Sequence, residues 1–210
     1  MTSNLSIEDI LAEGGLEEKR LVWEGTFADY LRMAVEDPSV SRLSHSLVYD
    51  AIMAEGVEFS PDGEPVYGLF RGEIFGLEER LDRIVQYFAA SAQRLEVRKR
   101  ILLMLGPPAS GKSSVVDLIK AALERYTRTD AGAVYAIQGC PMQEDPLHLV
   151  PEKLRAGLFE QYGVYVEGSL CPRCRYVLRT EYDGEVSEMA VARVTFDEKA
   201  AVGIGYYIAN

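Results

Sequence analysis

Cysteine is scarce in this sequence, and positive charge is in short supply. Three cysteines in 210 residues are too few for a disulfide framework in a chain of this size, which favours a reducing compartment. The 33 acidic side chains outnumber the 22 lysines and arginines and give a formal net charge of -11. Because phosphate neutralisation needs a basic surface, this balance argues against nucleic acid and against anionic membrane as partners.

Long apolar runs and targeting signals are also missing. The stretch from Met1 to Asp9 has no basic start and no apolar core of signal-peptide length. Elsewhere no apolar run approaches the roughly 20 residues that a membrane-spanning helix needs. The expected localisation is therefore cytoplasmic. What is present is an ordinary globular composition, 48% hydrophobic and 26% charged, which can build a substantial core.

The first half of the chain is dominated by helix-start signals. Residues 6–9 run from Ser to Asp and residues 26–29 from Thr to Asp, which is the spacing of a capping box at a helix N-terminus. Asp37 followed by Pro38 marks a third start, and apolar residues at roughly helical spacing continue from there to Gly56. We therefore predict three short helices in this region.

Three further elements are predicted toward the middle of the chain. Residues 57–73 contain Pro-Asp-Gly and a second proline, which predicts a turn-rich connection that can hold a short hairpin. From Gly76 we expect an amphipathic helix of about four turns, with Leu77 and Leu81 on its apolar face. Residues 101–105 form a continuous apolar run of strand length, the pattern of a buried parallel strand.

A phosphate-binding motif follows that run directly. Residues 106–113 read G-P-P-A-S-G-K-S, which matches G-x-x-x-x-G-K-[ST] between a predicted strand and a helix predicted at 114–126. In this motif the backbone N–H groups cradle phosphates, the lysine reaches the terminal phosphates and the hydroxyl binds magnesium. The predicted nucleotide-binding residues are Gly106, Pro107, Pro108, Ala109, Ser110, Gly111, Lys112, Ser113 and Ser114.

The motif predicts a nucleoside triphosphate, with ATP and Mg2+ as the expected cofactors and Ser113 as the Mg2+ ligand. Pro107 and Pro108 have no N–H group, so the amide donors must come from the later residues of the loop. The N-terminus of the following helix adds a partial positive charge beside the bound anion. A chance glycine and serine turn is disfavoured because both flanking elements are correctly placed.

Besides the phosphate-binding motif, several other segments resemble those of a known family, and together they span nearly the whole chain. They are W-E-G-T-F-A-D-Y-L at 23–31, F-G-L-E-E at 75–79, the loop at 106–114, Y-T-R-T-D at 126–130, Y-A-I-Q-G-C-P-M at 135–142, D-P-L-H-L at 145–149, C-P-R-C-R-Y at 171–176 and V-G-I-G at 202–205. The sequence resembles AAA+ ATPases and, within them, the bacterial PrkA-type serine protein kinases. The later segments are specific to that branch.

The resemblance implies an α/β fold: a P-loop NTPase (AAA+-like) parallel sheet core with a mainly helical N-terminal region and a mixed α+β insertion. It divides the chain into a helical region at 1–66, the first part of the nucleotide-binding domain at 67–138 and an insertion at 139–210. The domain is expected to be incomplete at its C-terminal side. Phe75 and Gly76 are expected to border the adenine.

The function that the resemblance implies is ATP binding within a serine protein kinase, where the nucleotide state regulates transfer of phosphate to protein serines. A protein substrate and self-association through the AAA+ module are the implied partners. Further catalytic motifs are expected beyond Asn210, so this chain alone is expected to lack the full machinery. Ala109 departs from the commoner glycine, and a positive φ there costs alanine on the order of 1 kcal/mol.

Other functions stay open at this point. The full protein can use ATP to remodel or degrade proteins, or the chain can act as a non-catalytic, nucleotide-responsive interaction module. A small-molecule P-loop kinase is disfavoured by the helical front end and by the insertion. The kinase label rests wholly on resemblance, since no protein-kinase Gly-rich loop, H-R-D or D-F-G stretch is present.

The insertion contains Cys171-Pro-Arg-Cys174, the spacing that lets two thiolates bind one metal ion. A tetrahedral Zn2+ ion would need two further ligands, and Cys140 and His148 are the local candidates. A free-thiol turn that packs against the fold is the competing interpretation, and a redox pair is a third. For His148, packing in a turn is favoured over catalysis.

The acidic side chains of this region are given structural rather than catalytic roles. Residues 191–198 resemble a strand ending in Asp-Glu, the arrangement that holds magnesium in AAA+ enzymes. The alternation with Arg193 and Thr195 predicts instead a half-exposed strand. The acids that we expect to be solvated are Glu144, Asp145 and Glu152.

Overall fold

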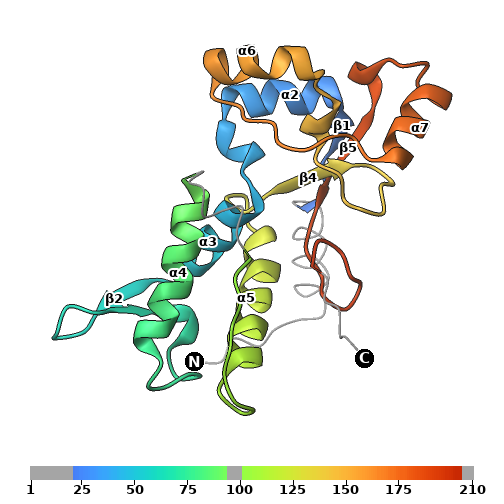
Figure 1. Ribbon diagram of the computed structural model, residues 1–210. Helices are drawn as coiled ribbons and strands as arrows, with labels where there is room; N and C mark the ends of the chain where they lie inside the picture. Colours follow the sequence, from blue (N-terminus) through green and yellow to red (C-terminus); the bar gives the residue numbers. More distant parts are fainter. Residues whose placement is uncertain (1–20, 94–100, 205–210) are drawn as a thin grey trace, which may run out of the picture. The chain divides into compact units, whose positions relative to one another are not determined.

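The structure is a computed structural model that describes residues 21–93 and 101–204 (Figure 1). Contacts within the chain divide it into two compact units. Unit 1 comprises residues 1–41 and 134–195, and unit 2 comprises residues 42–133 and 196–210. The division into 1–66, 67–138 and 139–210 stays a prediction, and the helix expected to follow residues 6–9 lies outside the described residues.

Unit 1 is built on a three-stranded antiparallel sheet in the order β1-β5-β4. Gly25 pairs with Val191 on one side of β5, and Tyr135 pairs with Arg193 on the other. Its elements are β1 (Glu24–Thr26), α2 (Phe27–Glu36), η1 (Pro38–Ser41), β4 (Val134–Ile137), η4 (Pro146–Leu149), α6 (Glu152–Tyr162), α7 (Pro172–Thr180), η5 (Val186–Glu188) and β5 (Ala190–Val194).

The start of α2 confirms the capping box at residues 26–29. The Thr26 side chain accepts a hydrogen bond from the Asp29 backbone N–H at 3.2 Å, and the Thr26 N–H donates to the Asp29 carboxylate at 3.0 Å. These two bonds satisfy backbone donors that a helix N-terminus leaves unpaired. The hydrogen bonds from Thr26 also hold the pKa of Asp29 below its usual value.

The core of unit 1 lies where α2 and the sheet meet the segments that follow β4. Apolar side chains from α2, at helical spacing, bury one face of that helix against them. Two of the three cysteines are part of this core, as small buried hydrophobes often are. The buried cluster consists of Phe27, Tyr30, Ala34, Ile137, Cys140, Leu147, Leu149, Val150, Val164, Cys174, Met189 and Val191.

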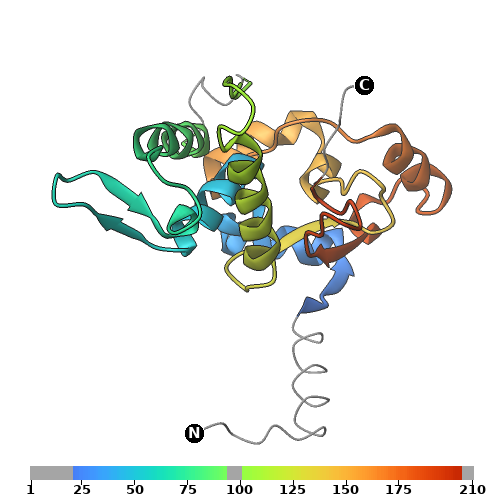
Figure 2. The same cartoon turned by 90° about the horizontal axis from the view of Figure 1, so that it is seen from below.

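The described part of unit 2 contains helices α3, α4 and α5 and a hairpin, which Figure 2 shows from below. The predicted hairpin is confirmed: β2 and β3 pair antiparallel, with Glu58 opposite Val66. The predicted helix after Gly76 is also confirmed. The elements are α3 (Ser44–Ala54), β2 (Val57–Phe59), β3 (Pro65–Tyr67), η2 (Gly68–Phe70), α4 (Glu78–Ala92) and α5 (Lys112–Thr127).

The third predicted helix is divided in two. Asp37 accepts a hydrogen bond from the Ser39 N–H at 2.9 Å, as a capping acid does, but the turn that it starts is the short 3-10 helix η1. The α-helix α3 begins only at Ser44. The capping signal therefore marked a real chain reversal, while the length of the helix was overestimated.

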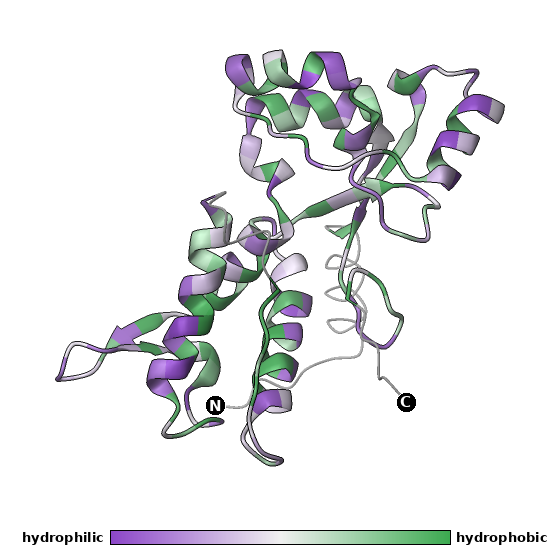
Figure 3. Ribbon diagram, in the orientation of Figure 1, coloured by the Kyte–Doolittle hydropathy of each residue, from purple (hydrophilic) through white to green (hydrophobic). Residues whose placement is uncertain are grey.

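The predicted strand at residues 101–105 is wrong. This segment has no strand conformation, and the exposed fractions of Ile101, Leu103 and Leu105 are 91%, 71% and 84%. Figure 3 shows the segment that leads into α5 in the hydrophobic colour. A strand exists only with a partner for its backbone groups, and all strand pairs among the described residues are antiparallel and involve other segments. The described strands therefore do not form the expected parallel sheet core.

The Asp-Glu pair after β5 has structural contacts, as the alternation of that strand suggested. Arg193 and Thr195 are half-buried, which confirms the half-exposed character of the segment. Asp197 forms a backbone bridge with Val202, and Glu198 accepts a hydrogen bond from Lys120 Nζ at 2.6 Å. Within residues 21–93 and 101–204, no helix has the length and apolar character needed to cross a membrane.

The capping box yields the first prediction. Replacing Thr26 with alanine removes the side-chain acceptor at the N-terminus of α2, so Thr26→Ala should lower the free energy of unfolding by about 1 kcal/mol. Thr180→Ala is the matched control, because its hydroxyl donates within α7 to the Tyr176 carbonyl in an exposed position. That control should change stability by less than about 0.5 kcal/mol. Equal effects of the two changes in urea unfolding would contradict the role of the cap.

Candidate functional site

The predicted phosphate loop is a tight bend that ends at a helix. Gly111 has a φ of 80°, in the left-handed region that glycine adopts without strain, and α5 begins at the next residue. The Gly111 carbonyl accepts the first helical hydrogen bond, from the Val115 N–H at 3.0 Å. Free N–H groups and the positive end of the helix dipole therefore lie at the loop.

The ammonium group of Lys112 is turned into the loop. Its Nζ donates hydrogen bonds to the carbonyl oxygens of Gly106 at 2.9 Å and Pro107 at 2.7 Å, and to Ser110 Oγ at 2.9 Å. A Cβ added at Gly106 would come within 2.9 Å of Ser110 Oγ and 3.7 Å of Lys112 Nζ. A side chain at this position would therefore crowd the space inside the bend and displace the Ser110 hydroxyl.

Other residues of the loop are open to solvent. Pro107, Pro108 and Ala109 are exposed, and so are Ser113 and Ser114 in the first turn of α5. The exposed first turn leaves the Ser113 hydroxyl accessible beside Lys112. The structure thus brings the predicted loop residues together around one bend, and their roles as ligands of ATP and Mg2+ stay predictions.

A cavity of about 340 Å³ lies beside the loop in unit 2. Its apolar wall comes from Leu77, which precedes α4, from Ile84 on α4 and from the segment 102–105, while Arg80 and Arg83 of α4 also line the cavity. Its polar end is formed by Ser110, Gly111 and Lys112. An apolar wall next to a cationic, amide-rich end is the arrangement that suits a molecule with a ring at one end and phosphates at the other.

The sequence predicted only part of the residues that line this cavity. Phe75 is 77% exposed, and the Gly76 N–H donates to Glu78 Oε1 at 3.0 Å, while neither residue lines the cavity. Leu77 is the neighbour that does, and its Cδ1 would lie 3.4 Å from a Cβ at Gly111. The helical spacing of the apolar residues on α4 was the signal for this face. The adenine role of Phe75 and Gly76 stays a prediction.

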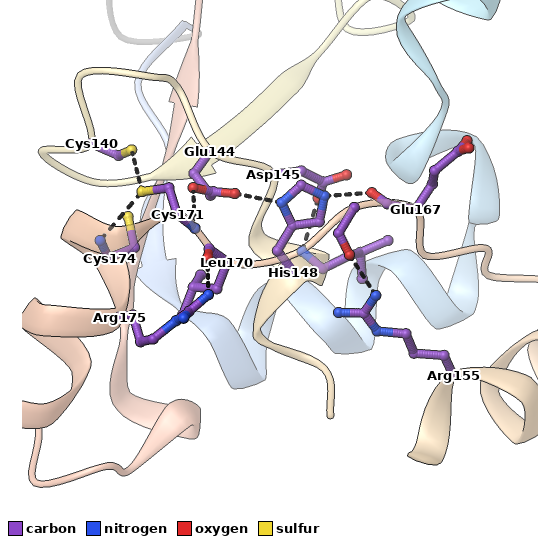
Figure 4. Close-up of polar contacts among 12 residues, drawn as sticks. Cys140, Glu144, Asp145, His148, Arg155, Glu167, Leu170, Cys171, Cys174 and Arg175 are labelled. Atoms are coloured by element: carbon purple, nitrogen blue, oxygen red, sulfur yellow. Dashed lines mark hydrogen bonds and ion pairs between the residues drawn. The ribbon is translucent and has the colours of Figure 1, made fainter. Parts of the chain in front are cut away.

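A second cluster lies in unit 1 and contains all three cysteines of the chain (Figure 4). Cys171 is the N-cap of α7, and its sulfur accepts a hydrogen bond from the Cys174 N–H at 3.3 Å. Cys140 Sγ, from the turn after β4, lies 3.9 Å from Cys171 Sγ. Glu144 completes the cluster, since the four ligand atoms all lie within 4.8 Å of one another. Burial raises the pKa of the Cys171 and Cys174 thiols.

The expectation that Glu144 and Asp145 are solvated is wrong. Glu144 is 7% exposed, and its Oε2 accepts a hydrogen bond from the Cys171 N–H at 2.9 Å. Burial raises the pKa of Glu144, but hydrogen bonds from Cys171 and His148 outweigh it, so that the pKa is lowered overall. Asp145 caps η4 through the Leu147 N–H at 2.8 Å, and burial raises its pKa. Glu152 is exposed, as expected.

His148 links the cluster to the segment before α7. Its Nδ1 lies 2.5 Å from Glu144 Oε1, and its Nε2 lies 2.5 Å from the Glu167 carbonyl oxygen. A Cβ at Gly168 would come within 2.6 Å of Nε2, so the close approach of this segment requires glycine. His148 thus packs within a turn, as expected, but as the hydrogen-bond partner of a buried carboxylate.

A loop that leads directly into a helix N-terminus, beside a cavity with a cationic end, is the local arrangement that the phosphate-binding motif predicts. Comparison with protein families agrees: the PrkA AAA domain matches residues 25–208. The chain belongs to the PrkA AAA domain family. No solved structure matches it significantly.

Curated relatives carry two different kinds of name. The chain is 50% identical over 192 residues to "ATP-dependent protease PrkA" of Bacillus subtilis, covering 91% of this chain and 30% of that protein. It is 28% identical over 130 residues to "Serine/threonine kinase YeaG" of Escherichia coli K12, covering 58% of this chain and 19% of that protein. A stretch of 61 residues, 29% of the chain, is 39% identical to 8% of a Lon protease from Rickettsia prowazekii. The chain thus spans less than a third of these relatives.

The loop geometry yields a second prediction. Ala109 has a φ of 59°, which costs an L-residue about 1–2 kcal/mol, whereas glycine gains unfolded-state entropy of about 0.4–1 kcal/mol. Ala109→Gly should therefore raise the free energy of unfolding by roughly 0.5–1 kcal/mol. The same change inside α5, Ala121→Gly, should lower it by about 1 kcal/mol. A loss of stability in both variants on chemical unfolding would show that Ala109 is not strained.

Proposed function

We propose that this chain is the ATP-binding AAA portion of a PrkA-like serine protein kinase, in which the nucleotide state regulates phosphorylation of protein serine residues. The observation that carries the ATP-binding part is the position of the Lys112 ammonium inside the loop, at the N-terminus of α5. A cation held there in a bend of backbone amides has the chemistry of an anion-binding site.

Each part of the loop has a defined task in this proposal. The Lys112 ammonium exchanges carbonyl partners for oxygens of the β- and γ-phosphates, which are the stronger, charged acceptors. The N–H groups of residues 109–114 bind the remaining phosphate oxygens, and the exposed Ser113 hydroxyl supplies a ligand for Mg2+. The apolar wall with Leu77 and Ile84 receives the base. Bound Mg2+ neutralises phosphate charge.

The kinase part of the proposal rests on two sources of support. The segments that resemble PrkA-type kinases extend over nearly the whole chain, and a relative in Escherichia coli is named a serine/threonine kinase. The groups that transfer phosphate are assigned to the rest of a longer polypeptide, and the AAA module is assigned a role in self-association. A protein serine is the substrate of that longer form.

A protease is the second candidate, and a specific observation favours it. The Bacillus subtilis relative, which matches 91% of this chain, is named an ATP-dependent protease. ATP binding by the loop described above serves either activity equally well. The choice between them therefore depends on the chemistry of the longer form.

The third prediction tests nucleotide binding. A charged hydrogen bond of about 1.5–3 kcal/mol is lost in Lys112→Ala, which should raise the Kd for ATP about 10- to 100-fold. Lys153→Ala is the matched control, since it removes the same charge from an exposed position on α6 in unit 1. Isothermal titration of both variants gives the result. Unchanged affinity in Lys112→Ala, or equal loss in Lys153→Ala, would refute the proposed site.

The fourth prediction concerns magnesium. If Ser113 supplies a Mg2+ ligand, then Ser113→Ala should weaken binding of ATP in the presence of Mg2+ while leaving binding in excess chelator unchanged. Ser39→Ala serves as the control, because this serine lies on the 3-10 helix η1 of unit 1. A loss of affinity that is the same with and without Mg2+ would assign Ser113 another role.

The kinase and protease candidates are separated with a longer natural form that includes this chain. Incubated with ATP and a casein-type protein mixture, a kinase should transfer the γ-phosphate to serine, which phosphoserine mass spectrometry detects. A protease should instead release peptides in an ATP-dependent manner. Both reactions should be lost in Lys112→Ala of the longer form. Peptide release without phosphoserine would replace the kinase proposal with the protease.

A further inference from the structure

The cysteines of this chain meet in three dimensions although they are far apart in the sequence. Cys140 comes from the turn after β4, and Cys171 and Cys174 come from the N-cap and first turn of α7, so that Cys140 and Cys171 are 31 positions apart in the sequence. Cys140 and Cys174 are buried, and Cys171 is half-buried. Thus the fold places every thiol of the chain in one small, largely dry volume.

The spacing of the ligand atoms fits a tetrahedral zinc ion. With Zn–S bonds of about 2.3 Å, two thiolates of one tetrahedral site lie about 3.8 Å apart. The observed distance between Cys140 Sγ and Cys171 Sγ is 3.9 Å, and Cys174 Sγ and a Glu144 oxygen complete a set in which no pair is more than 4.8 Å apart. These are side-chain atoms of two segments, placed without a covalent link between them.

Two backbone N–H groups point at ligand atoms of the cluster. The Cys174 N–H donates to Cys171 Sγ at 3.3 Å, and the Cys171 N–H donates to Glu144 Oε2 at 2.9 Å. Both donors belong to the N-terminal end of α7, where the helix dipole stabilises negative charge. Three thiolates and one carboxylate around a dication leave the same net charge as a four-cysteine zinc site.

The other oxygen of the Glu144 carboxylate is held by His148. His148 Nδ1 contacts Glu144 Oε1, and His148 Nε2 contacts the Glu167 carbonyl, so both ring nitrogens are engaged. In Figure 4 the Glu144 carboxylate lies between the sulfur atoms and the imidazole ring. Histidine that is fixed in this way orients a ligating carboxylate rather than reaching the metal itself.

We propose that Cys140, Cys171, Cys174 and Glu144 bind one structural Zn2+ ion, with His148 positioning the carboxylate. Thiolate-rich sets select zinc over magnesium or calcium, which prefer oxygen ligands. Four protein ligands in a buried place leave no open coordination position, so the ion joins the turn after β4 to α7 and does not activate water.

The test uses the 210-residue chain, reduced with a phosphine, exposed to zinc chloride and freed of excess metal. We expect about one zinc per chain by plasma mass spectrometry. All three thiols should resist alkylation until a strong chelator is added, and no other cysteine contributes to that signal. Cobalt chloride in place of zinc should give thiolate-to-cobalt charge-transfer absorption. These measurements use the unmodified chain, so they decide the proposal even where a variant does not fold.

Variants then assign the ligands. Cys171→Ser and Glu144→Gln should each lose the zinc, whereas Glu152→Gln, an exposed control, should keep it. His148→Gln should retain the zinc but weaken its binding about 10- to 100-fold, because the residue that orients the Glu144 carboxylate is changed. Loss in His148→Gln with retention in Glu144→Gln would make the histidine the ligand and overturn this assignment.

Two results would overturn the site as a whole. One is a reduced wild-type chain that retains no zinc and whose thiols react at the same rate with and without chelator. The other is a disulfide between Cys140 and Cys171 that persists in the same reductant. Neither result bears on ATP binding by the loop, because the two sites lie in different units and share no residue.

Discussion

The Lys112 ammonium is held by the backbone of its own loop, and the proposed phosphate-binding site depends on this contact. Two carbonyl oxygens and one hydroxyl surround it, which requires the chain to reverse through Gly111 in a left-handed conformation. The packing of α5 holds this reversal in place, because its residues Val115, Ala122 and Leu123 are buried in unit 2. The helix thus anchors the bend, and its N-terminus lies where the proposed site would receive negative charge.

In unit 1, several segments meet at one buried carboxylate, that of Glu144. Glu144 cannot be buried without partners, because the desolvation of a charged group is costly. Its partners are the Cys171 amide on one side and His148 on the other, so the turn after β4, η4 and the start of α7 meet at one side chain. The packing of the thiols beside it follows from the same convergence of segments.

The sequence predicted correctly those elements whose contacts join residues close together in the chain. The capping box at Thr26, the β2–β3 hairpin, the apolar face of α4 and the loop before α5 all depend on residues a few positions apart. The apolar run at 101–105 misled because its pattern predicts burial but cannot name a partner strand. Glu144 was missed for a related reason: its burial depends on Cys171, 27 positions away, and acids near a proline normally indicate a solvated turn.

The order in which the segments of each unit are synthesised limits when that unit can fold. Each unit draws on two separate stretches, and the backbone changes unit after residues 41, 133 and 195. Strand β5, which is central in its sheet, is among the last described elements, so β1 must await a neighbour that is synthesised more than 160 residues later. No single cut in the backbone between these units releases either of them whole. The three-stranded sheet of unit 1 therefore closes only after β5 has been synthesised, and truncation at any one of these three positions separates the parts of at least one unit.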